Sequence, residues 1–182
     1  LMVVDCVAHG KSGHAAREEG VNAIYKAVED IKWFQTYSFP EVSDLLGKVK
    51  MSVTLISAGI QHNVVPDKCS FSVDIRVNEC YTNKEVFEVI QSNVQSDVVA
   101  RSFRLNSSSV DKNHAFVKKC LSMNLPVFGS STLSDQTFMS FPSVKIGVGD
   151  SARSHTADEY IYISEISDAI EMYISLLSGL RI

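Results

Sequence analysis

The sequence lacks the features that mark membrane, nucleic-acid-binding and secreted proteins. No apolar run approaches the roughly 18–20 residues needed to cross a bilayer, and the opening Leu1-Met2-Val3-Val4 is too short for a signal peptide. Lys and Arg are scattered and the net charge is −4, which argues against nucleic-acid binding through bulk electrostatics. We therefore expect a cytoplasmic protein with neither a nucleic-acid nor a membrane partner.

The sequence also has few cysteines, and they are widely spaced. Cys6, Cys69, Cys80 and Cys120 include no C-x-x-C pair, which argues against a structural zinc knuckle and a dense disulfide framework. We predict reduced thiols, with Cys6 and Cys69 at apolar positions of strands. Hydrophobic residues make up 45% of the 182 residues and charged residues 21%, a globular composition. The chain begins inside a predicted strand over 2–8, which suggests a fragment of a longer protein.

Two kinds of spacing alternate along the first part of the chain. Apolar residues at helical spacing predict a helix over 18–34. Apolar and polar residues that alternate predict strands over 49–55 and 69–77. The apolar residues are Val21, Ile24, Val28 and Ile31 in the helix, and Val49, Met51, Val53 and Leu55 in the first of these strands.

A second helix and a last strand complete the first part. Thr82 and Glu85 form a capping box that opens the helix, and a strand is predicted over 98–105. The resulting order is the β-α-β-β-α-β pattern of a ferredoxin-like domain. We predict such a domain over residues 1–106.

Residues 107–182 are predicted to form an incomplete α/β piece. Helices are expected over about 112–123, near 135–140 and from about 164, with a strand at 143–147. These helices have too few strands to cover, so apolar surface should be exposed there. The apolar face of the last helix consists of Ile166, Ile170, Tyr173, Ile174 and Leu177.

Three local contexts could carry chemistry. In Gly13-His14-Ala15, His14 could donate a hydrogen bond to a developing oxyanion or lie in an ordinary connecting loop. Asn63, in the turn over 59–67, can present an amide to a substrate. Arg76 lies on the polar face of a strand, where a guanidinium suits a carboxylate ligand. Local sequence alone favours a surface pair of Arg76 with Asp74 or with a carboxylate on a neighbouring strand.

The third context is a glycine-rich stretch over 147–160 that contains His155, followed by Asp158 and Glu159. Neutral imidazole is a common zinc ligand. A single histidine cannot hold zinc, because a catalytic site needs at least three protein ligands. The alternative is that Asp158 caps the element that follows.

These segments resemble the metallo-amidohydrolase family that contains acetylornithine deacetylase, succinyl-diaminopimelate desuccinylase, aminoacylase and related dipeptidases, and acetylornithine deacetylase most. The segments that carry the resemblance are Gly13-His14-Ala15, Gly20-Val21-Asn22-Ala23-Ile24, Asn63-Val64-Val65-Pro66-Asp67, Asp74-Ile75-Arg76, Ser134-Asp135 and Ser154-His155-Thr156-Ala157-Asp158-Glu159.

The resemblance implies a function for each part of the chain. Residues 1–106 would be the lid or dimerisation domain of a homodimer, and 107–182 the C-terminal part of the catalytic domain. The parent enzyme would use two zinc ions, which cobalt can replace, to cleave the amide bond of an N-acyl amino acid or a small peptide. His155 would be a zinc ligand, and His14 would stabilise the tetrahedral intermediate in the partner's site. Asn63, Arg76 and Ser134 would bind substrate.

The sequence also departs from that family. The family's His-x-Asp pair, bridging Asp and Glu-Glu pair precede the lid, and no His here has an Asp two residues later. We interpret Glu18-Glu19 as charge favoured at a helix N-terminus. The resemblance therefore implies no stably bound metal in this chain. Alternatives are a non-catalytic dimerisation and substrate-binding module, a dipeptidase or a succinyl-diaminopimelate desuccinylase as the parent, and an amino-acid-binding regulatory domain.

Overall fold

The computed structural model describes residues 1–181, which form two compact units. The first unit contains Leu1–Ser108 with Gly129–Ser140, and the second contains Ser109–Phe128 with the chain from Phe141 onward. The domain boundary expected near residue 106 stays a prediction. Among the described residues, no helix is long and apolar enough to cross a membrane.

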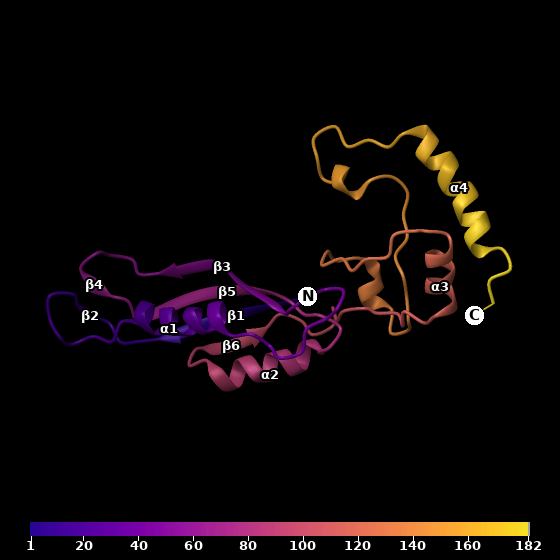
Figure 1. Cartoon of the computed structure of the whole chain (residues 1–182). Helices are drawn as coiled ribbons and strands as arrows, with labels where there is room; N and C mark the ends of the chain where they lie inside the picture. The colour runs from indigo at the N-terminus through magenta and orange to yellow at the C-terminus, as the bar shows by residue number, and fades with distance from the viewer. Residues whose placement is uncertain (182) are drawn as a thin grey trace. The chain divides into compact units, whose positions relative to one another are not determined.

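The first unit has the predicted ferredoxin-like topology (Figure 1). Its main sheet has the strand order β3-β5-β1-β6, and each neighbouring pair is antiparallel. A second, two-stranded sheet joins β2 to β4. The elements of the first hundred residues are β1 (Met2–His9), β2 (Gly13–His14), α1 (Ala23–Thr36), β3 (Lys50–Ala58), β4 (Val64–Val65), β5 (Lys68–Arg76), α2 (Asn83–Asn93) and β6 (Asp97–Ala100).

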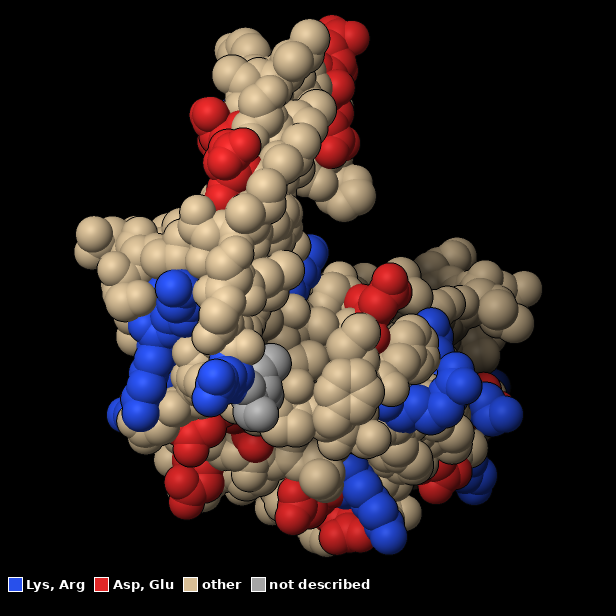
Figure 2. All heavy atoms as spheres, turned by 90° about the vertical axis from the view of Figure 1, so that its right-hand side faces the viewer, with Lys and Arg blue, Asp and Glu red and all other residues tan. Residues whose placement is uncertain are grey.

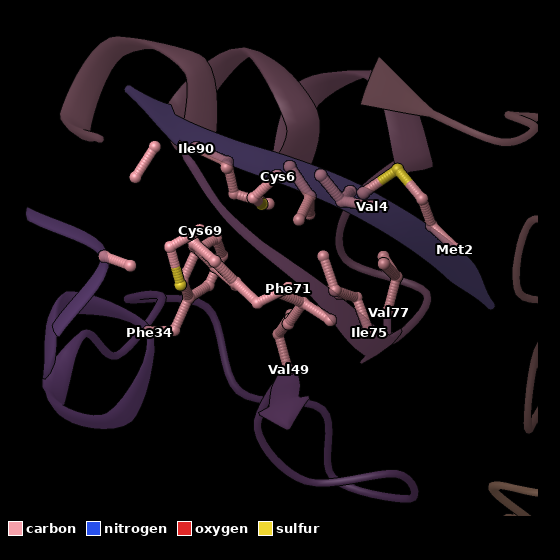
Figure 3. Close-up of a cluster of buried hydrophobic side chains, with 14 of the residues drawn as sticks. Met2, Val4, Cys6, Phe34, Val49, Cys69, Phe71, Ile75, Val77 and Ile90 are labelled. Carbon is pink, nitrogen blue, oxygen red and sulfur yellow. The ribbon is translucent and has the colours of Figure 1, made fainter. Parts of the chain in front are cut away.

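The core lies between one face of the main sheet and both helices. Alternate residues of β1 and β5 are buried, and they form one cluster with residues of α1 and α2. Figure 3 shows Met2, Val4 and Cys6 in a row along β1, with Phe34, Phe71 and Ile75 in the same cluster. All four cysteines are free, and Cys6 and Cys69 are buried as predicted. Burial raises the pKa of Cys6 to about 12, so this thiol is unreactive at neutral pH.

The helix α1 packs on the sheet with a different face from the one predicted. Its buried side chains are Ala23, Ala27, Asp30 and Phe34. Val21, just before the helix, and Val28, both of the predicted stripe, are exposed, as is Tyr25. Small alanines let the helix lie close to the sheet, whereas Tyr25 and Val28 lie on the outer side. The predicted stripe was therefore wrong by about one position, although Ile24 and Ile31 do pack against the core.

The strand β3 also differs from the predicted alternation. The register shifts between Val53 and Leu55, which marks a β-bulge. Because a bulge inserts one residue, the side chains beyond it change faces. Met51 and Val53 pack against the core, whereas Leu55 is 62% exposed. The expectation that Leu55 shares their face was wrong.

Several element boundaries move by a few residues. Asn22 caps α1 by accepting a hydrogen bond from the Ile24 N–H, so Glu18 and Glu19 lie in the preceding turn instead of the helix. The strand predicted over 98–105 is β6, which ends at Ala100. The predicted capping box is confirmed, because Thr82 and Glu85 exchange hydrogen bonds at the start of α2.

The remaining helices are short apart from the last, and the predicted strand at 143–147 does not form. A strand needs a neighbour to accept its hydrogen bonds, and no strand lies within the described part of the second unit. The apolar surface expected there is confirmed, since Ile166, Ile170, Ile174 and Leu177 are exposed. The elements are α3 (Ala115–Ser122), η1 (Asp135–Phe138), η2 (Ser151–Arg153) and α4 (Ile163–Leu177).

Candidate functional site

The two-stranded sheet brings two predicted site residues together. In the pairing of β2 with β4, His14 lies opposite Val64, and the Ala15 N–H donates to the Asn63 carbonyl at 2.9 Å. His14 and Asn63 are therefore neighbours on one β-ribbon, and both are exposed. The ribbon leaves β1 at Gly10, where a Cβ atom would lie 2.1 Å from the Val21 carbonyl oxygen. Only glycine permits that close approach.

The backbone of the ribbon also fixes the tautomer of the His14 ring. The Ala16 N–H donates to Nδ1 of His14 at 3.1 Å. In a neutral imidazole the nitrogen that accepts carries no proton, so the proton sits on Nε2. His14 therefore presents an N–H donor at the tip of an exposed side chain. That is the group needed to stabilise a developing oxyanion.

Arg76, at the end of β5, is held by Asp74 on the same face of the strand. Nε of Arg76 donates to one Asp74 oxygen at 2.7 Å and Nη2 donates to the other at 3.0 Å. The surface pair that local sequence favoured is thus present. Nη1 contacts the Ser131 carbonyl at 3.5 Å. A guanidinium has five N–H donors, so the edge formed by Nη1 and Nη2 still offers donors to a second carboxylate.

Ser134 belongs to the same unit as Arg76. It is the N-cap residue of η1 and half-buried, and its hydroxyl donates to Oε1 of Gln136 at 3.4 Å. Ser131, three residues earlier, is the residue whose carbonyl meets Arg76. The fold thus places Arg76 beside the segment that holds Ser134.

The structure separates Arg76 from His14 and Asn63. Lys68, at the opposite end of β5 from Arg76, pairs with His9, and the ribbon extends from there. Eight residue steps at about 3.3 Å each place the two ends of β5 roughly 26 Å apart. One small substrate cannot touch both groups within a single chain.

His155 lies in the second unit, on an exposed loop between η2 and α4. Its backbone is left-handed, with φ of 62°, and its N–H donates to a Glu159 oxygen at 3.0 Å. Asp158, with φ of 57°, does not cap the next helix, because Tyr162 is the N-cap residue of α4. That alternative for Asp158 was wrong.

Within residues 1–181, no three His, Cys, Asp or Glu side chains lie close enough together to hold a metal ion. His155 alone therefore does not make a metal centre, since at least three protein ligands are needed. Figure 2 shows one face of the molecule, on which both acidic and basic side chains are exposed.

Sequence reasoning missed the ion pair beside His155. Arg153 donates to Glu165 through two nitrogens, and both side chains are about three-quarters covered or more, with 20% and 25% exposed. The available signal was an arginine two residues before the histidine and a glutamate in the first turn of the next helix. The sequence alone does not show that these two residues form an ion pair, because the pair requires the loop between them to bring them together.

Solved structures resemble this chain over most of its length. Two similar solved structures are the aminopeptidase PepT from Bacillus cereus (20% identity, TM-score 0.67, 97% of this chain and 50% of the other) and a tripeptidase from Staphylococcus aureus (18% identity, TM-score 0.66, 98% and 51%). An M20 family metallo-carboxypeptidase from Sulfolobus solfataricus shares 13% identity at a TM-score of 0.55, over 77% of this chain and 54% of its own. A search of curated proteins gives no match.

At these identities the solved structures establish a shared fold. The chain spans about half the length of the aminopeptidase and the tripeptidase. Independently, residues 1–101 match the M20 peptidase dimerisation domain, which covers more than half of the 182 residues. The chain therefore belongs to the M20 peptidase family through its dimerisation domain.

Proposed function

We propose that this chain supplies the dimerisation domain and part of the catalytic domain of a metal-dependent hydrolase. The reaction is cleavage of the amide bond of an N-acyl amino acid, with acetylornithine deacetylase as the first candidate for the parent enzyme. The observation that carries the proposal is the β-ribbon of a peptidase dimerisation domain, which presents the Nε2–H of His14 beside Asn63.

Each site residue has a proposed role that fits its surroundings. His14 donates from Nε2 to the oxygen of the tetrahedral intermediate. Asn63 offers its amide to the substrate, and Ser134 a hydroxyl. Arg76, oriented by Asp74, binds the substrate carboxylate through the N–H donors that Asp74 and Ser131 leave unused. His155 is proposed as one metal ligand, with the other ligands coming from outside the described residues.

The distance between the ends of β5 determines how these residues can be shared. His14 and Asn63 lie on one ribbon, whereas Arg76 lies at the far end of β5, roughly 26 Å from the end at which the ribbon begins. A small substrate therefore meets Arg76 of one subunit and the ribbon of its partner. We propose a composite site in a homodimer, formed by the lid residues of both subunits.

The outer side of α1 supports the same dimer. Tyr25 and Val28 are exposed, at 72% and 47%, and lie on one side of the helix at helical spacing, and Val21 just before the helix is 44% exposed. The neighbouring edge strand β3 has only β5 as a partner among the described strands, and Leu55 and Ile56 on it are exposed. Exposed apolar side chains on a helix and on an edge strand with one unpaired side are typical of a protein interface.

A charge placed in that surface should separate the dimer. In Tyr25→Asp the carboxylate would be buried without a partner, which is costly, so we expect mainly monomer at micromolar concentration. Sedimentation velocity measures the change. Lys84→Asp, on the exposed side of α2, is the matched control and should remain dimeric. A dimeric Tyr25→Asp protein would show that α1 lies outside the interface.

A second candidate is a dimerisation and substrate-binding module without catalysis. It is favoured by one observation, namely that residues 1–181 contain no group of metal ligands. Zinc that remains at near one equivalent or more per chain after dialysis of the full-length protein would exclude this candidate.

Hydrolysis assays on the full-length, metal-loaded protein test the proposal. We expect release of free amino acid from acetylornithine or another N-acyl amino acid. Preferred cleavage of dipeptides, or of succinyl-diaminopimelate, would identify a different parent enzyme in the same family. If metal is bound and none of these substrates is cleaved, the proposed reaction is wrong.

A further inference from the structure

The loop that carries His155 holds a backbone conformation that few residues adopt. His155 and Asp158 have φ of 62° and 57°, in the left-handed region that is uncommon for residues other than glycine. Such conformations persist only where the surrounding structure holds them, and they concentrate at functional sites. The contacts that hold this loop therefore bear on where the imidazole of His155 points.

Arg153 makes the strongest of these contacts. Its Nη1 and Nη2 donate to the two carboxylate oxygens of Glu165 at 2.8 and 2.6 Å. The guanidinium also lies over the rings of Tyr160 and Tyr162, at 4.9 and 5.2 Å from the ring centroids. The Arg153 side chain thus links the start of the loop to two tyrosines at its end and to the first turn of α4.

Glu165 closes the loop from the other side. Besides Arg153, its carboxylate accepts the Tyr162 N–H at 2.9 Å, which completes the cap of α4. The hydrogen bonds from Arg153 and from the Tyr162 N–H lower the pKa of Glu165 to about 2, so the carboxylate is charged at neutral pH. The Arg153–Glu165 ion pair therefore holds the two ends of the loop over residues 154–162 together.

Two further hydrogen bonds shape the interior of this loop. The Thr156 hydroxyl donates to the Arg153 carbonyl at 2.6 Å, and the His155 N–H donates to Glu159 at 3.0 Å. Both are short-range contacts that need the loop ends to be in place. The Arg153–Glu165 pair spans twelve residues and closes the loop at its base.

We propose that Arg153, through its bidentate pair with Glu165, is the positioning residue that holds the His155 loop in its left-handed conformation before any ligand binds. The importance of this for the reaction rests on the proposed role of His155 as a metal ligand. Arginine is required at this position because its planar fork matches the carboxylate and stacks on both rings, which lysine cannot do.

Hydrogen exchange of the 182-residue chain, followed by mass spectrometry, tests the proposal. In Arg153→Met we expect amides of residues 154–162 to exchange at least about tenfold faster, as local opening becomes easier. Peptides from α3, in the same unit, and from β5 should be unchanged. Glu165→Gln keeps an oxygen to cap α4 but loses the charge, so it should accelerate exchange less. Arg153→Lys should restore only part of the protection.

The imidazole of His155 gives a second readout. Its NMR signal, assigned by its loss in His155→Gln, should shift or broaden in Arg153→Met and recover partly in Arg153→Lys. Exchange in the loop within twofold of wild type would overturn the proposal. Equal acceleration in α3 would also overturn it, because Arg153 would then stabilise the whole unit and not the loop.

A separate measurement keeps this result distinct from the proposed function. His155→Ala in the full-length protein should lower its metal content if His155 is a ligand. Unchanged metal content would end the ligand role of His155 and leave the exchange result on the loop intact. If His155→Ala loses metal while exchange in Arg153→Met is unchanged, His155 is supported as a ligand and the positioning role of Arg153 is wrong.

Discussion

Mixing His14→Ala subunits with Arg76→Ala subunits should restore hydrolysis that neither variant supports alone. Each homodimer lacks one group in both of its composite sites, and loss of an oxyanion donor such as His14 typically lowers turnover by about 10²–10³. A heterodimer combines the intact Arg76 of one subunit with the intact His14 of the other. One of its two sites is then complete.

The size of the recovery follows from the symmetry of a two-fold dimer. Random exchange makes half of the dimers mixed, and each mixed dimer has one complete site, so activity should reach about a quarter of wild type. The variants are mixed, dissociated and reassociated, and initial rates are measured against each variant treated alone. Recovery of this size would place Arg76 and His14 of one chain in different active sites.

Asn63 provides the matched control. Because His14 and Asn63 lie on one ribbon, a mixed dimer of His14→Ala and Asn63→Ala has a defect in each site and should show no recovery. If His14→Ala with Arg76→Ala also fails to recover, although the mixed dimer is present, the composite site is wrong. Recovery in both mixtures would mean that His14 and Asn63 do not act together.

Replacing Asp30 should destabilise the first unit strongly. The Asp30 side chain is 4% exposed, and its carboxylate accepts the N–H groups of Gln95 and Ser96 and the Ser96 hydroxyl, at 3.0, 2.8 and 2.5 Å. Asp30→Ala leaves these donors without an acceptor. Since a hydrogen bond to a charged group is worth about 1.5–3 kcal/mol, we expect a loss of at least about 3 kcal/mol in the free energy of unfolding.

Chemical denaturation, with thermal unfolding as a second measurement, checks the size of this effect. The melting temperature should fall by roughly 10 °C or more, given the entropy of unfolding of a domain this small. Asp30→Asn keeps an acceptor oxygen and should lose less. Glu88→Ala removes a carboxylate from an exposed pair with Lys84 and should cost at most about 0.5 kcal/mol. Equal losses in Asp30→Ala and Glu88→Ala would show that the buried contacts contribute little.

The fold of the first unit could be predicted because its signals are local and repeated. Strict alternation in β5 and the capping box of Thr82 and Glu85 follow from neighbouring residues alone. The side of α1 that faces the sheet could not be predicted, because the helix has apolar residues on two sides. The inner side is formed mainly by alanines and Asp30, whereas the spacing of the large apolar residues predicts the other side as the buried one. The bulge before Leu55 leaves no mark in the alternation either.

The candidate site was predictable as separate segments and not as an arrangement. His14, Asn63, Arg76, Ser134 and His155 could each be selected from its own context. Pairing of β2 with β4 joins the first two, and the length of β5 separates them from Arg76. Such distances depend on which strands pair, which no single segment encodes. Arg153 was missed because its partner lies beyond a loop whose closure is itself a result of folding.

In the proposed dimer, the length of β5 sets the distance between two active sites. Arg76 at one end serves the site of its own subunit, and the ribbon that begins at the other end serves the site of the partner. An insertion or deletion of two residues would keep every β5 side chain on its face but change this spacing by about 6.6 Å. The sheet would still fold, but Arg76 and the ribbon would no longer be correctly spaced for either of the two active sites. In the proposed dimer, the length of this one strand therefore affects the chemistry of both sites.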